Sequence, residues 1–219
     1  MFTKLKDFLF KNQTVKQTIV KNTFWRTFSE VMGRAIRAII VIYAARVLGV
    51  ENYGVFSYAL GFVGLFAIFG DIGIDSLVAR EVAKGELPKE KVIASGFLMK
   101  FILGSLSYLI IFFGAIAFTP IAASKILIPF LGLAIIFDSW RQFNFSVLAG
   151  LQKNEVQAAI MLVNQSSAVI FGLLALWVWQ TAISLAAAYA LASATGLVLV
   201  ICYLRDFYKN IVQNFDIVI

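Results

Sequence analysis

The sequence FWRTFSEVMGRAIRAIIVIYAAR at residues 24–46 can cross a bilayer as one helix, because about 20 mostly apolar residues span the hydrocarbon core. Before Arg46 at its end, this segment nevertheless carries four charged residues, Arg26, Glu30, Arg34 and Arg37. At about 100° per residue they fall within an arc of about 80°, so they form one charged stripe. A charge near the middle of a spanning helix costs about 2.5 to 3.5 kcal/mol unless it is wet or paired. The pattern therefore predicts that the charged stripe faces a water-filled cavity between helices.

The composition of the whole chain indicates an integral membrane protein. Hydrophobic residues make up 61% and charged residues 14% of the 219 residues. An ordinary soluble domain has roughly 45 to 50% and 25%. The net charge of +7 could suggest a nucleic-acid partner, but the basic residues lie between apolar runs and not on a polar surface with interleaved aromatic residues. We therefore expect membrane lipids as partners and no nucleic acid.

Cysteine and histidine usage excludes several kinds of site. Cys202 is the single cysteine and the chain has no histidine. An internal disulfide is impossible, and the usual zinc sites lack their ligands. We expect no metal and no cofactor.

Apolar segments predict an all-α fold with six transmembrane helices. A break is expected in the second of them, where Gly70 and Gly73 bracket Asp71. The predicted spans cover residues 24–46, 53–79, 92–118, 122–150, 156–179 and 182–204. We accordingly divide the chain into a basic N-terminal segment at 1–23, a six-helix lobe at 24–204 and a C-terminal segment at 205–219.

The distribution of Lys and Arg predicts the orientation in the membrane. If the N-terminus is cytoplasmic, the outer links hold only Arg46 and Lys125, against twelve basic residues on the inner side. The inner set is Lys4, Lys6, Lys11, Lys16, Lys21, Arg80, Lys84, Lys89, Lys91, Lys153, Arg205 and Lys209. We therefore expect a multi-pass protein of the cell membrane with both termini in the cytoplasm.

Three further charged residues, Lys100, Asp138 and Arg141, lie inside predicted spans. With this orientation they and the charged stripe all fall in the cytoplasmic half of the membrane. Together these residues and the charged stripe contain five cationic side chains and two carboxylates, a net charge of +3. This charge predicts a cationic vestibule suited to an anion. The candidate substrate-binding residues are Arg26, Glu30, Arg34, Arg37, Lys100, Asp138 and Arg141.

Structural roles remain open for some polar residues. Asp138 and Arg141 stand three residues apart on one helix and could neutralise each other, and Lys100 could extend to the membrane interface. Asp71 and Asp75 are interpreted as cap or turn residues beside the predicted break. Asn164 and Gln165 are interpreted as hydrogen-bonding contacts between helices.

Three motifs then resemble a known family. AARVLGVENYGVFSYALGF at residues 44–62 places Gly49 and Gly54 around a tight turn between the first two helices. It is followed by GDIGIDSLVAREVAKG at 70–85 and by FNFSVLAGLQKNEVQAAIMLVNQ at 143–165. In this order the motifs resemble the N-terminal half of the polysaccharide or oligosaccharide flippases, of the multidrug/oligosaccharidyl-lipid/polysaccharide exporter superfamily.

The resemblance implies a transporter and not an enzyme. Such proteins move lipid-linked oligosaccharides on a polyprenyl phosphate from the inner to the outer leaflet. Two lobes of MATE-like architecture alternate access to a central cationic cavity. By this resemblance Arg26, Arg34 and Arg37 would bind the phosphate head group, since a guanidinium pairs bidentately with phosphate oxygens. Glu30 would orient them and could take a proton during the cycle.

The chain resembles only one of the two lobes. We therefore expect it to be a truncated or split product, or to work with a second copy or a separate C-terminal lobe, and not to transport by itself. Alternatives are a drug or cation antiporter of the same superfamily, for which cavity acids would be expected, and a non-transporting membrane fragment or scaffold. A membrane-bound enzyme would need a catalytic carboxylate pair, but the longest internal loop has only Glu81, Glu86 and Glu90 among lysines.

Overall fold

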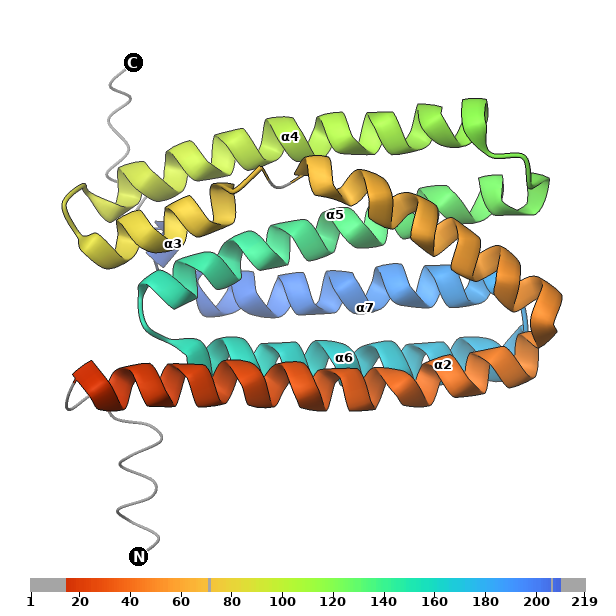
Figure 1. The fold of residues 1–219 in the computed structure, drawn as a ribbon, viewed down its shortest axis with the longest axis horizontal. Coiled ribbons are helices and arrows are strands. Elements are labelled where there is room, and N and C mark those ends of the chain that lie inside the picture. The colour runs from red at the N-terminus through yellow and green to blue at the C-terminus, as the bar shows by residue number, and fades with distance from the viewer. Residues whose placement is uncertain (1–14, 71, 206, 210–219) are drawn as a thin grey trace, which may run out of the picture.

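Residues 15–70, 72–205 and 207–209, described by a computed structural model, form helices that lie side by side, with no strand among them (Figure 1). Within this part of the chain, five helices are long and apolar enough to cross a membrane: α2, α4, α5, α6 and α7. The elements in chain order are α2 (Val15–Ala67), the 3-10 helix η1 (Ile68–Gly70), α3 (Ile74–Lys84), α4 (Lys89–Phe118), α5 (Ala122–Gly150), α6 (Asn154–Val178) and α7 (Ala182–Tyr203).

Helix α2 contains the first predicted span and most of the second. A straight helix of 53 residues would be about 80 Å long, more than twice the roughly 30 Å of a hydrocarbon core. Gly49 instead adopts φ 72° and ψ 174°, a left-handed φ that favours glycine. The helix therefore turns back at this residue; its first arm runs beside α6, and its second arm crosses obliquely toward α4 (Figure 1). The turn was predicted to extend from Gly49 to Gly54, but the non-helical backbone is confined to Gly49. The first two predicted spans are therefore joined in one helix, and the described residues contain five long apolar helices and not six.

The predicted break in the second span is confirmed. Helix α2 ends at Ala67, a short 3-10 helix follows, and α3 begins at Ile74 after Gly73, whose φ is 77°. The chain then turns through Gly85, which also has a positive φ, into α4. As a result α3 lies beside the first turns of α4 at the end of the bundle opposite Gly49, which we call the α3 end (Figure 1).

Glycines allow α3 to pack closely on its neighbours. A Cβ atom added at Gly96 of α4 would lie 2.6 Å from Val78 Cγ2 and 3.0 Å from Phe143 Cε2. One added at Gly150 of α5 would lie 2.7 Å from Val82 Cβ and 2.9 Å from the carbonyl oxygen of Ala79. The second position is the less forgiving, because backbone cannot move aside as a side chain can.

The Gly150→Ala variant is therefore expected to lower the free energy of unfolding by about 1 to 3 kcal/mol, the cost of overpacking a close contact. Thermal unfolding of the purified protein in detergent measures this. Gly104→Ala is the matched control, since nothing lies within 4 Å of a Cβ at that position. It should be neutral or slightly stabilising, because alanine favours helix more than glycine does. Equal losses in the two variants would contradict the packing argument.

Two apolar clusters fill the bundle, one toward each end. The cluster nearer Gly49 is centred on buried residues such as Ile40, Phe56 and Leu131. The cluster nearer the α3 end is centred on residues such as Val78 and Phe143. Between the two, each of α2, α5, α6 and α7 carries polar side chains, and this central layer holds the candidate site.

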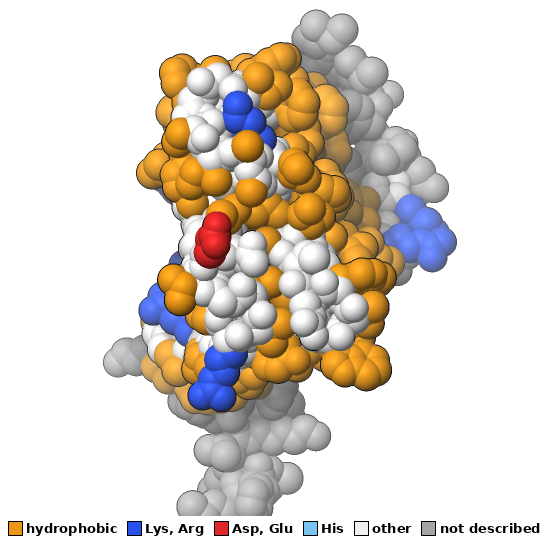
Figure 2. Space-filling model, turned by 90° about the vertical axis from the view of Figure 1, so that its right-hand side faces the viewer, with side chains coloured by type: hydrophobic (Ala, Val, Ile, Leu, Met, Phe, Trp, Pro, Cys, Tyr) orange, Lys and Arg blue, Asp and Glu red, His pale blue; other side chains and the backbone are white. Residues whose placement is uncertain are grey.

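The outward faces of the helices are apolar as well. Large hydrophobic side chains are exposed along the whole bundle, with Trp177 74% and Phe118 76% exposed. Figure 2 looks onto the Gly49 end, where most side chains are hydrophobic or uncharged and few are charged. The apolar sides of the helices suit a lipid environment, since soluble monomers rarely expose contiguous apolar patches this extensive.

One hydrogen bond ties the segment after α7 back to the bundle. The Tyr208 hydroxyl donates to Asn144 Oδ1 at 2.7 Å, and Asn144 Nδ2 donates to the Trp140 carbonyl oxygen at 2.7 Å. Burial raises the pKa of Tyr208 to about 12. The hydroxyl therefore keeps its proton, and this hydrogen bond, throughout the physiological pH range.

Candidate functional site

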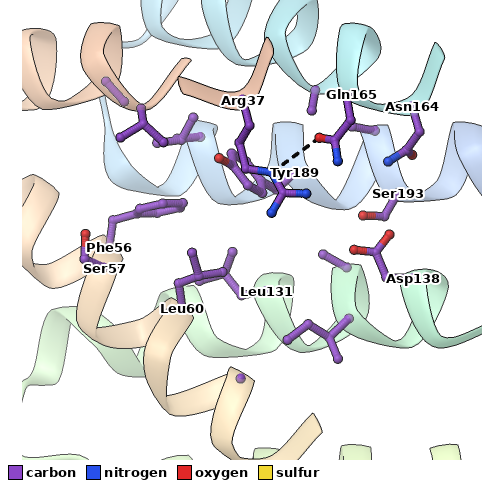
Figure 3. Close-up of a pocket in the computed structure, with 18 of the residues that line it drawn as sticks. Arg37, Phe56, Ser57, Leu60, Leu131, Asp138, Asn164, Gln165, Tyr189 and Ser193 are labelled. Atoms are coloured by element: carbon purple, nitrogen blue, oxygen red, sulfur yellow. Dashed lines mark hydrogen bonds between the residues drawn. The ribbon is translucent and has the colours of Figure 1, made fainter. Parts of the chain in front are cut away.

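A cavity of about 350 Å³ lies in the central layer, between both arms of α2 and helices α5, α6 and α7 (Figure 3). Its walls are mainly small or apolar residues such as Ala44, Leu131 and Ala192. Polar side chains enter it from every surrounding helix: Arg37, Tyr53, Ser57, Asp138, Asn164, Gln165, Tyr189 and Ser193. A few converging polar groups in an apolar enclosure are typical of small-ligand sites.

Arg37 is the cation that points into this cavity. Its Nε donates to Gln165 Oε1 at 3.4 Å, across the contact between α2 and α6 (Figure 3). This long hydrogen bond orients the guanidinium and leaves its other N–H groups directed toward the cavity. The interpretation of Gln165 as a hydrogen-bonding contact between helices is confirmed, and the same residue also lines the cavity.

Asp138 and Arg141 form an ion pair on α5 at the edge of the cavity. Arg141 Nη2 lies 2.7 Å from Asp138 Oδ1, and the side chains are 11% and 44% exposed respectively. Asp138 lines the cavity and points toward Ser193 (Figure 3). The interpretation that the two charges neutralise each other is thus confirmed.

A second set of contacts fixes Arg141 behind Asp138. Its guanidinium carbon lies 5.4 Å from the centre of the Phe145 ring, a cation–π distance. With the Asn164 amide turned opposite to the orientation drawn in Figure 3, its oxygen accepts from Arg141 Nη1 at 3.1 Å, and its nitrogen donates to the Ala192 carbonyl oxygen at 2.7 Å. Gly196 of α7 makes room, since a Cβ there would lie 2.9 Å from Arg141 Cδ. Arg141 is therefore a positioning residue that holds Asp138 and links α5 to α6.

The charge balance of this central layer favours an anion. Arg37 and Arg141 supply two positive charges and Asp138 one negative charge, which leaves +1. A guanidinium can pair with phosphate or carboxylate oxygens through two parallel hydrogen bonds. In the described residues, no group of three or more His, Cys, Asp or Glu side chains could hold a metal ion.

The rest of the charged stripe lies outside the cavity. Arg26 Nε and Glu30 Oε1 form an ion pair at 3.3 Å with side chains 71% and 45% exposed, and Arg34 is exposed. Arg37 differs from Arg26 and Glu30 by only about 20° around the helix. It reaches the cavity because it lies further along the first arm, level with the second arm of α2 and with α5 and α7. Only Arg37 of the predicted stripe reaches the cavity.

Lys100 is also separate from the cavity. Its Nζ lies 3.0 and 3.1 Å from the two carboxylate oxygens of Asp75, and both side chains are buried, at 1% and 8% exposed. Lys100 does not extend to the interface, so that alternative is wrong. Asp75 does lie in the first turn of α3 as predicted, but inside the bundle and paired, while Asp71 lies outside the described residues.

Sequence reasoning missed four cavity residues: Tyr53, Ser57, Tyr189 and Ser193. Tyr189 and Ser193 stand four residues apart on α7, so they share a face of an otherwise apolar helix, and this spacing could have indicated them. Tyr53 and Ser57 have the same spacing on the second arm of α2. The return of α2 at Gly49 brings Tyr53 to the same cavity as Arg37.

Comparisons with known proteins show what the chain is similar to. A family model described as "Polysaccharide biosynthesis protein" matches residues 19–218. A Shigella flexneri protein named "Putative O-antigen transporter" is 32% identical over 139 residues, which are 60% of this chain and 30% of that relative. The chain thus spans about a third of the length of that relative. No solved structure matches the chain.

The match to the family model covers almost all of the described residues and includes every helix of the bundle. The helices are apolar on their outer faces, as a multi-pass membrane protein requires. The chain belongs to the polysaccharide biosynthesis protein family.

Proposed function

We propose that this chain is the N-terminal lobe of a flippase that moves lipid-linked oligosaccharides from the inner to the outer leaflet of the cell membrane. The observation that carries the proposal is the cavity beside the apolar cluster of the Gly49 end, which polar side chains enter from every surrounding helix and into which Arg37 points. A net positive charge in this layer favours an anionic head group and disfavours the organic cations that a drug antiporter would carry.

In this proposal, binding is electrostatic and no bond is made or broken. Arg37 presents its free N–H groups to phosphate oxygens of the polyprenyl phosphate, and Gln165 holds the guanidinium in place. Asp138 and Arg141 fix one wall, while Ser57 and Ser193 supply hydroxyls suited to sugar or phosphate oxygens. Alternating access then requires one end of the bundle to open while the other stays closed.

The exposed part of the stripe has a role in the same proposal. Arg26, Glu30 and Arg34 lie on the surface of this lobe. A second lobe, from a separate chain or a second copy, would cover them and form the far wall of a shared cleft. There they would guide the head group toward Arg37, with Glu30 setting the orientation of Arg26 through the ion pair at 3.3 Å.

The proposed orientation places the α3 end in the cytoplasm. Basic residues gather at that end, including Arg80, Lys84 and Lys91, whereas Arg46 and Lys125 belong to the Gly49 end. An excess of Lys and Arg marks cytoplasmic links. Each arm of α2 then crosses the membrane once, giving six passes and both termini in the cytoplasm.

Genetic complementation tests the proposal. A strain lacking its flippase is given this chain alone, a candidate C-terminal lobe alone, or both, with membrane insertion checked by immunoblot of membrane fractions. We expect surface polysaccharide only when both are present. Rescue by this chain alone would show that it needs no second lobe. Failure of every pairing, with the proteins inserted, would favour a non-transporting scaffold.

A further inference from the structure

A second hollow lies at the α3 end, away from the cavity that contains Arg37. It has a volume of about 500 Å³ and is formed by α2, α6 and α7. Its lining residues are Trp25, Glu155, Val156 and Ala159 together with Leu199 and Tyr203, among others. We call it the inner groove. Apart from Glu155 its walls are apolar or aromatic, so it suits a hydrocarbon chain and not a sugar.

The groove runs from the end of the bundle toward its middle. Glu155 lies in the first turn of α6, and Leu162, deeper along the same helix, also lines the groove. At about 1.5 Å per residue, the apolar floor therefore extends about 10 Å into the hydrocarbon region. Trp25 and Tyr203 flank the polar mouth, where aromatic side chains of membrane proteins gather at the interface with water.

The mouth of the groove carries a net positive charge. Lys153, just before α6, places its Nζ 5.4 Å from the centre of the Tyr203 ring. Glu155 is neutralised by Lys21 of α2, whose fully buried Nζ lies 3.3 Å from Glu155 Oε2. Two ammonium groups against one carboxylate leave +1, which complements the single negative charge of a phosphodiester head group.

From this combination we infer that the inner groove is a binding site for one anionic membrane phospholipid. An acyl chain lies on the apolar floor, and the phosphate lies between Lys153 and the interface. The inference is independent of what the protein transports, because the groove shares no lining residue with the Arg37 cavity. The lipid would bridge α2, α6 and α7 at the point where the first arm of α2 meets the bundle.

Native mass spectrometry of the purified 219-residue protein tests the inference, with phosphatidylglycerol and phosphatidylcholine of identical acyl chains. We expect retention of phosphatidylglycerol over phosphatidylcholine by about fivefold, the effect of roughly one surface cation facing an anionic lipid. Lys153→Ala should remove this preference. Lys91→Ala, an exposed lysine on α4 at the same end, is the matched control and should leave it unchanged.

A groove-filling variant separates the site from general surface charge. Ala159→Trp occupies the floor without changing charge and should lower retention of phosphatidylglycerol at least fivefold, with circular dichroism confirming that the helices remain. Equal binding of both lipids, equal effects of Lys91→Ala and Lys153→Ala, or full retention in Ala159→Trp would each overturn the inference. Displacement of phosphatidylglycerol by undecaprenyl phosphate would do so too, since it would make the groove a substrate site.

Discussion

Arg37→Ala is expected to reduce polysaccharide export by at least about tenfold in the strain that carries both lobes. This guanidinium points into the central cavity and is oriented by Gln165. Losing a hydrogen bond to a charged group typically costs about 1.5 to 3 kcal/mol, and about 1.4 kcal/mol is a tenfold change in affinity. Export is measured as surface polysaccharide per inserted protein, which separates loss of function from loss of protein.

Two further variants make the Arg37 test specific. Arg37→Lys keeps the charge but loses the planar fork, so it should restore export only in part. Arg46→Ala removes an exposed arginine from the same arm of α2, close to Gly49 and outside the cavity, and should export normally. If Arg46→Ala were as defective as Arg37→Ala, overall positive charge and not the position of Arg37 would explain the loss.

The second large effect concerns stability. Lys100→Ala should lower the free energy of unfolding by about 3 to 5 kcal/mol, because it leaves the buried Asp75 carboxylate without its ammonium partner. The measurement is thermal unfolding in detergent, together with the yield of folded protein from membranes. Asp75→Ala should be similarly damaging, since it leaves the Lys100 ammonium buried.

The double variant distinguishes charge pairing from packing. Asp75→Asn combined with Lys100→Met removes both charges at nearly constant volume, and replacing a buried pair in this way is often close to neutral. We expect it to recover most of the stability lost in Lys100→Ala. A double variant as unstable as the single ones would mean that the other contacts of these side chains, and not their mutual attraction, stabilise α3 on α4.

The sequence predicted the helices well because their signals are local. Apolar segments of sufficient length marked every span, and two glycines marked the break before α3. The return of α2 was also predicted, but with a longer link than the structure has. Where the first span ends and the second begins depends on the backbone conformation of one residue, Gly49. A hydropathy pattern does not locate a turn to a single residue.

The site was predicted only in part because its members come from different helices. The helical wheel grouped Arg26, Glu30, Arg34 and Arg37 correctly on one face. Arg37 lies between Arg26 and Glu30 on this face, and what distinguishes it is its position along the helix, at the level where the second arm of α2 encloses the cavity. A helical wheel does not show that position. Lys100 was separated from the others by its pairing with Asp75, which is a tertiary contact between α3 and α4. Tyr189 and Ser193 were overlooked because isolated polar residues in an apolar helix have many possible partners.

The division of the bundle into two apolar clusters has a consequence for its local stability. A single continuous core melts as one cooperative unit, whereas two cores separated by a polar layer can loosen independently. Amide hydrogen exchange should therefore show two protection classes, one around Phe56 and Leu131 and one around Val78 and Phe143. Either end of the molecule can then open to solvent while the side chains at the opposite end stay packed and exclude water.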